Sequence, residues 1–232
     1  MSGVHEPDTA VYTRRREELI DEGSGSLAVT TSIPASMMLR LLIRPRSVFR
    51  LLADADPAPL VVFFKFALWL GLLPPLFAYI GASTFGWRVG VVEPLFLPQP
   101  TLIAISIAYF CSLLFGFFSA SIISRWMAVT YGARDSLGVH LAMMVIVGAP
   151  LAIASLMHLY PNALLNAVVF VPTMIWSMYL LYRGLPTILH TTPEQGMLMA
   201  SSIIGYLLVA AVSLLGLTVF LWVMGIGPAL GV

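Results

Sequence analysis

Three side chains in the apolar part of this sequence carry groups that could do acid–base chemistry. Lys65 lies within one hydrophobic stretch, and His140 and His158 lie near the two ends of another. An amine or an imidazole among apolar residues can move a proton or activate a serine hydroxyl. If the stretch is a helix, however, the two histidines are about 27 Å apart and cannot share a ligand. We therefore predict that both histidines are interfacial residues at the edges of a membrane.

The sequence lacks the patterns that would complete a catalytic or ligand site. It contains no phosphate-binding glycine loop, no H-E-x-x-H zinc pattern and no G-x-S-x-G turn. Its one cysteine, Cys111, has no neighbours suited to a metal site, and we interpret it as a small packing residue. We expect no catalytic residue, no cofactor and no metal, and we predict that the protein is not an enzyme.

Five hydrophobic stretches must position the residues described above. Each is free of acidic residues, and each reaches about 30 Å as a helix, the thickness of the hydrocarbon core of a bilayer. The chain is 59% hydrophobic and 10% charged, whereas soluble domains carry about 25% charged residues. The sequence therefore predicts an all-α, polytopic transmembrane bundle. The five spans are expected at residues 58–80, 101–123, 137–159, 163–182 and 200–224.

Arginines are distributed unequally between the two ends of the predicted spans. Arg88 is alone on one side. The other side collects Arg40, Arg44, Arg46, Arg50, Arg125, Arg134 and Arg183. Because positive charge is retained in cytoplasmic loops, we predict a cytoplasmic N-terminus and an external C-terminus. The net charge of +1 gives no reason to expect nucleic acid as a partner.

The charge and composition also divide the chain into four predicted regions. Residues 1–35 form a polar, largely disordered cytoplasmic tail, and residues 36–56 an amphipathic interfacial segment. Residues 57–226 form the membrane domain, and residues 227–232 a C-terminal tail.

The interfacial segment pairs its arginines at helical spacing. Arg40 and Arg44 share one helix face, Arg46 and Arg50 share another, and Pro45 separates the two short pieces. One interpretation is a topology anchor whose arginines reach lipid headgroups. The other is a docking surface for lipid or for a partner protein.

A ridge of small residues recurs at every fourth position of the second span. Its members are Ala104, Ala108, Ser112, Gly116, Ala120 and Ser124. Small side chains at this spacing let another helix approach closely. The ridge packs either inside the bundle or against a second membrane protein.

Lys65 and the prolines inside the spans also allow two interpretations. The Lys65 ammonium either extends back to the headgroups or is buried beside carbonyls freed by Pro74 and Pro75. These prolines, with Pro150 and Pro172, are either structural kinks or broken helices that line a transport site.

The most distinctive segment runs from Trp176 to Pro186 (W-S-M-Y-L-L-Y-R-G-L-P) and continues with T-P-E-Q at residues 192–195. It resembles the bacterial branch of the Yip-type (Ypt/Rab-interacting-protein-like) membrane family, as do residues 44–50 and 127–161. The resemblance implies five spans in the bacterial cytoplasmic (inner) membrane and an accessory or membrane-organising role. The D-L-Y-G-P segment of eukaryotic members is absent, so small-GTPase binding is not expected.

The same segment has a structural explanation. Gly184 and Pro186 are expected to end the fourth span, and Thr192 to cap the next helix with Pro193 in its first position. This leaves three candidates for a contact at the cytoplasmic rim, namely Tyr179, Tyr182 and Arg183.

Together these observations predict a non-enzymatic membrane scaffold or accessory subunit. Its expected partners are membrane lipids and another integral membrane protein, bound through the arginine segment and the small-residue ridge. The alternative is a permease or transporter component with a site among kinked spans 1, 3 and 4 that includes Lys65.

Overall fold

The computed structural model describes residues 45–88 and 93–224, apart from the Trp222 side chain, and they lie in one compact unit. The long helices are α5 (Leu68–Phe85), α6 (Gln99–Thr130), α7 (Leu137–Ala154), α8 (Ala163–Ile188) and α9 (Pro193–Val223). Shorter helical elements are α3 (Pro45–Asp54), α4 (Pro59–Val62), the π-helical turn η1 (Phe63–Ala67) and the 3-10 turn η2 (Ser155–Leu159). Five helical segments are long and apolar enough to cross a membrane, which confirms the predicted fold class.

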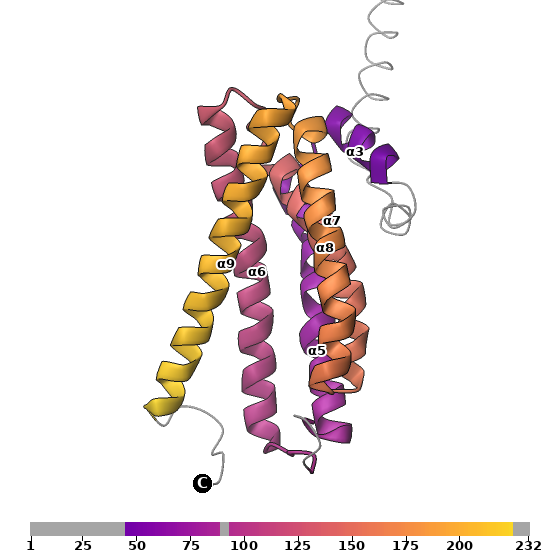
Figure 1. The fold of residues 1–232 in the computed structure, drawn as a ribbon, viewed down its shortest axis with the longest axis vertical. Coiled ribbons are helices and arrows are strands. Elements are labelled where there is room, and N and C mark those ends of the chain that lie inside the picture. Colours follow the sequence, from indigo (N-terminus) through magenta and orange to yellow (C-terminus); the bar gives the residue numbers. More distant parts are fainter. Residues whose placement is uncertain (1–44, 89–92, 225–232) are drawn as a thin grey trace, which may run out of the picture. The chain divides into compact units, whose positions relative to one another are not determined.

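The spans pack around α7, which is the central helix. Its apolar segment is 67% buried, whereas those of α6 and α9 are each 6% buried. Helix α7 contacts α5, α6 and α8, and α9 packs on α6 and α8 (Figure 1). Side chains near the start of α7 are therefore buried by protein whether they are polar or apolar.

The chain alternates between two ends of this bundle. One end, here called the α3 rim, holds α3, the ends of α6 and α8 and the starts of α7 and α9 (Figure 1). The opposite end, the far rim, holds residues 86–88, 93–98 and 160–162, which lie between the helices. At the far rim, the Asn162 side chain caps α8 by accepting a 3.0 Å hydrogen bond from the Leu165 amide.

The helices continue through the prolines that lie inside the predicted spans. Helix α5 includes Pro74 and Pro75, α7 includes Pro150, and α8 includes Pro172. The irregular turns lie instead at η1, before α5, and at η2, after α7. This continuity favours the structural interpretation of these prolines over broken helices that line a transport site, because a membrane helix packed against neighbours can accommodate proline.

The expected helix end at Gly184 and Pro186 was wrong. Helix α8 continues to Ile188, and the chain turns at His190, whose φ is 52°. A Cβ atom on Gly184 would lie 2.8 Å from Met143 Cε and 3.0 Å from Phe49 Cε1. This glycine therefore permits close packing of α3 and α7 on α8.

The predicted cap and first residue of the last helix are confirmed. Thr192 Oγ1 accepts a 3.3 Å hydrogen bond from the Gln195 amide, and α9 begins at Pro193 with Glu194 in its first turn. The helix begins seven residues before the predicted span at 200–224, because the more polar first turns contribute little to hydropathy.

Helix α3 confirms the amphipathic pattern over the part of the segment that the structure describes. Val48, Phe49 and Leu52 are buried, whereas Arg46 and Arg50 are exposed. Pro45 stands at its first position. The rest of the predicted segment, including Arg40 and Arg44, and the predicted tails lie outside the described residues.

Candidate binding site

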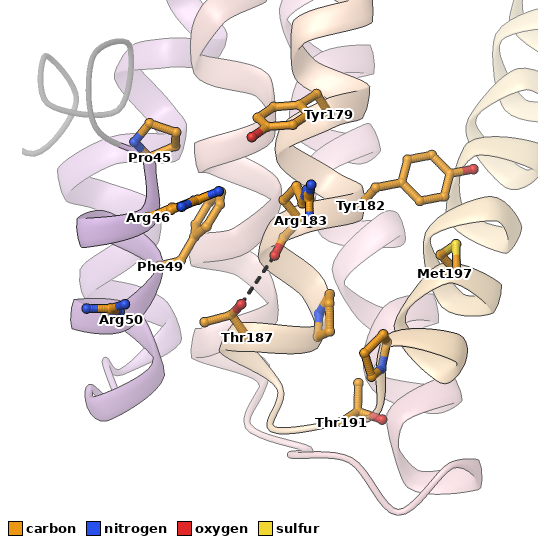
Figure 2. A pocket seen from close by; sticks show the side chains of 12 residues that line it. Pro45, Arg46, Phe49, Arg50, Tyr179, Tyr182, Arg183, Thr187, Thr191 and Met197 are labelled. Carbon is orange, nitrogen blue, oxygen red and sulfur yellow. Dashed lines mark hydrogen bonds between the residues drawn. The ribbon is translucent and has the colours of Figure 1, made fainter.

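A pocket at the α3 rim brings together two sets of residues singled out in the sequence. Its volume is about 700 Å³, and it lies between α3, α8 and the start of α9 (Figure 2). The lining residues are Pro45, Arg46, Phe49, Arg50, Tyr179, Tyr182, Arg183, Pro186, Thr187, Thr191, Pro193 and Met197. We call this the rim pocket. The predicted arginine pair of α3 and the predicted contact residues of α8 thus form a single site.

Helical periodicity explains how α8 presents its share of the lining. Tyr179, Arg183 and Pro186 are spaced by four and three residues, so they project from one face of the helix. Figure 2 shows Arg46 and Phe49 extending from α3 toward α8, where the Tyr179 hydroxyl points back toward α3.

The rim pocket is positively charged. Its lining contains three arginines and no carboxylate. Within the described residues the ion pair is between Arg134 and Asp56, so the guanidinium groups of the pocket have no carboxylate partner there. Arginine and tyrosine side chains donate hydrogen bonds. The chemistry of this lining suits an anion with several acceptor oxygens.

Aromatic contacts hold the α8 side of the pocket. The Arg183 guanidinium carbon is 6.0 Å from the centre of the Tyr179 ring, and Trp176 stacks on the same ring at 5.1 Å. The Tyr182 hydroxyl is 2.9 Å from Ser201 Oγ and links α8 to α9.

A second group of polar residues holds α3 in place. Arg134 donates 2.7 Å hydrogen bonds from Nη1 to the Ala53 carbonyl and from Nη2 to the Ala55 carbonyl. It also lies 3.3 Å from Asp56 Oδ1, and His190 Nε2 donates to the Ala53 carbonyl at 3.1 Å. We call these contacts of Arg134 and His190 the Arg134 clasp. These hydrogen-bond donors at the end of α3 satisfy carbonyls that the helix leaves free.

Sequence reasoning missed this clasp. The sequence indicated for Arg134 only a contribution to the charge difference between the two ends of the spans, and it indicated no role for Asp56 or His190. The Arg134 and Ala53 positions are 81 residues apart. No local pattern in the sequence indicates a contact over that separation.

His140 is fully buried by protein at the start of α7, so the prediction of a membrane-edge residue gave its position along the helix but not this enclosure. Its Nε2 is 3.0 Å from the Arg134 carbonyl, and its Nδ1 is 2.8 Å from Ser124 Oγ. A carbonyl only accepts hydrogen bonds, so in the neutral ring Nε2 carries the hydrogen and Nδ1 accepts from the serine. The central position of α7 explains the burial. A serine–histidine pair can generate a nucleophile, but this one lines neither pocket and packs α6 against α7.

His158 lies beside a second pocket, of about 390 Å³, at the far rim. Its Nδ1 is 2.8 Å from Asn166 Oδ1, and its ring stacks on Phe170 at 5.0 Å. The prediction of a membrane-edge residue gave its position along the helix but not this half-buried environment. Most of the lining surface is apolar, and its polar members are Tyr79, Arg88, Ser106, Tyr109, His158 and Asn166.

Lys65 and the small-residue ridge lie away from both pockets. Lys65 is exposed on η1, and its Nζ is 5.7 Å from the centre of the Phe66 ring. Along the ridge, Ala104 and Ala108 are exposed, Ser112 and Gly116 are half-buried, and Ala120 and Ser124 are buried. The ridge therefore packs internally only near the α3 rim. The described residues contain no group of three potential metal ligands.

The chain also matches known proteins. The family model of the Yip1 domain matches residues 39–227. Two proteins named inner membrane protein YohC, from Escherichia coli strain K12 and from strain O6:H1, are each 32% identical to it over 155 residues. Each match covers 67% of this chain and 80% of the relative. No solved structure matches.

Proposed function

This chain belongs to the Yip1 domain family, and we propose that it is a non-enzymatic accessory subunit of the bacterial cytoplasmic membrane that binds another integral membrane protein. The family membership and the naming of its relatives as inner membrane proteins support the location. The partner surface is the open part of the small-residue ridge on α6.

One observation carries this proposal. The ridge continues past the region where α6 is packed, and a Cβ atom placed on Gly116 would meet nothing within 4 Å. Ala104 and Ala108 are exposed further along the same helix. Lipid tails are as apolar as leucine and do not require small side chains, whereas a second helix does. A protein partner therefore accounts for the pattern better than lipid does.

The chain offers a matched pair of variants for the test. A Cβ atom added to Gly116 on α6 or to Gly216 on α9 would meet open space, but only Gly116 belongs to the ridge. Gly116→Leu and Gly216→Leu proteins would be purified in mild detergent beside the wild type, and co-purifying proteins quantified by mass spectrometry. We expect a stoichiometric membrane partner in the wild type and in Gly216→Leu, and its loss in Gly116→Leu.

Two results would contradict the proposal. The first is a wild-type monomer with no stoichiometric partner. The second is a complex that contains only copies of this chain, which would make the ridge a self-association surface.

A further inference from the structure

We propose that the rim pocket binds the phosphate headgroup of an anionic glycerophospholipid. This inference goes beyond the accessory role proposed above, because it concerns α3, α8 and α9 rather than the α6 ridge. It assigns a ligand to the site that Arg46, Arg50 and Arg183 form together.

Charge is the first argument. Three arginines line one cavity without a carboxylate in its lining. All three side chains are exposed, so their charges are available to a ligand. Like charges held close together repel one another, and a bound anion relieves that repulsion. Guanidinium groups bind phosphate through paired hydrogen bonds, and the Tyr179 hydroxyl supplies a further donor at the same face.

The second argument is that the pocket is formed before a ligand arrives. Phe49 and Leu52 bury the apolar face of α3 at 2% and 0% exposure. The Arg134 clasp holds the carbonyl end of the same helix through two 2.7 Å hydrogen bonds. Arg46 and Arg50 therefore stand on a fixed helix, and binding does not require α3 to be ordered.

The third argument distinguishes a lipid from a soluble anion. A volume of about 700 Å³ is larger than a phosphate group requires and falls within the range of about 300–1,000 Å³ typical of small-molecule sites. Pro186 and Met197 add apolar surface beside the arginines. Tyrosines and arginines at the end of a span lie at the depth of lipid headgroups. The mixed lining therefore suits a phosphate joined to a glycerol backbone and the start of its acyl chains.

The test uses the full-length protein after removal of co-purified lipid. Native mass spectrometry would measure binding of phosphatidylglycerol, of zwitterionic phosphatidylcholine and of soluble glycerol 3-phosphate. The variants are Arg46→Gln/Arg183→Gln and, as a matched control, Arg125→Gln. Arg125 is an exposed arginine of the same rim that does not line the pocket.

We expect the wild type to bind phosphatidylglycerol at least about tenfold more tightly than phosphatidylcholine. A tenfold change corresponds to about 1.4 kcal/mol. The double variant should lose this preference, and Arg125→Gln should keep it within about twofold. Arg183→Lys, which keeps the charge but not the planar fork, should fall between the two.

Several outcomes would overturn the inference. One is a preference for phosphatidylglycerol that is unchanged in the double variant. Another is an equal loss of this preference in Arg125→Gln, because that result would indicate binding to diffuse surface charge. Glycerol 3-phosphate that binds as tightly as the lipid would make a soluble anion the occupant. Thermal unfolding of each variant in detergent verifies that the fold is intact. Gly116→Leu should retain lipid binding, which separates failure of this inference from failure of the accessory role.

Discussion

At the scale of single residues, glycines mark points where two backbone segments of this bundle touch. A Cβ atom on Gly138 would meet the Pro57 carbonyl oxygen, and one on Gly81 would meet the His158 carbonyl oxygen. Backbone atoms cannot move aside as the end of a flexible side chain can. Gly184 differs, because its nearest neighbours are the side chains of Met143 and Phe49. The three positions should therefore tolerate substitution unequally.

We predict that Gly138→Ala lowers the free energy of unfolding by about 1–3 kcal/mol, the usual cost of overpacking. Gly116→Ala should be neutral or slightly stabilising, because its Cβ has open space and alanine favours a helix. Thermal unfolding in detergent measures both. Equal unfolding temperatures for the two variants would show that α7 and the backbone at Pro57 do not approach as closely as the structure has them.

At the scale of elements, α3 depends on two different kinds of contact. Its apolar face packs on α7 and α8. Its C-terminal carbonyls are held by the Arg134 clasp. The ion pair of Arg134 with Asp56 should contribute little, because the Asp56 side chain is 62% exposed, and exposed pairs are worth about 0–1 kcal/mol. Hydrogen bonds from a charged group are worth about 1.5–3 kcal/mol each, so the carbonyl contacts should dominate.

Arg134→Gln should therefore loosen α3 far more than Asp56→Asn. We expect faster hydrogen exchange across residues 45–54 in Arg134→Gln, with the amides of α7 still protected. Asp56→Asn should resemble the wild type. Faster exchange in the Asp56 variant alone would assign the stability of α3 to the ion pair instead.

At the scale of the whole molecule, the arginines of the described residues gather at one end of the bundle. Arg46, Arg50, Arg125, Arg134 and Arg183 lie at the α3 rim, and Arg88 lies at the far rim. The loops between the spans are short, which is the condition under which the charge rule applies. The α3 rim is therefore predicted to face the cytoplasm. Five spans then place the two termini on opposite sides.

Cysteine labelling tests this orientation directly. In a Cys111→Ala background, a cysteine at position 229 should react with a membrane-impermeant thiol reagent in intact cells. A cysteine at position 26 should react only after the membrane is opened. The reverse pattern would invert the predicted orientation, and equal labelling of both positions would contradict an odd number of spans.

The sequence by itself determined the number of spans and their approximate ends. It also singled out the two groups of residues that line the rim pocket, the arginines of α3 and the candidate contact residues of α8. Hydropathy, capping and periodicity are local properties, so they can be recognised in consecutive residues. The Thr192 cap and the buried face of α3 follow from such patterns. The helix end expected at Gly184 was wrong, because the same residues also suit close packing inside a helix.

Only the tertiary structure decided which of these features meet. His190 contacts the Ala53 carbonyl across 137 positions of the chain, and Arg46 shares its pocket with Arg183. His140, at the end of a predicted span, is enclosed because α7 is central, and hydropathy does not reveal which of five apolar helices lies in the middle. Contacts of this kind depend on how the helices pack against one another. A pocket assembled from three helices therefore becomes visible only once that packing is known.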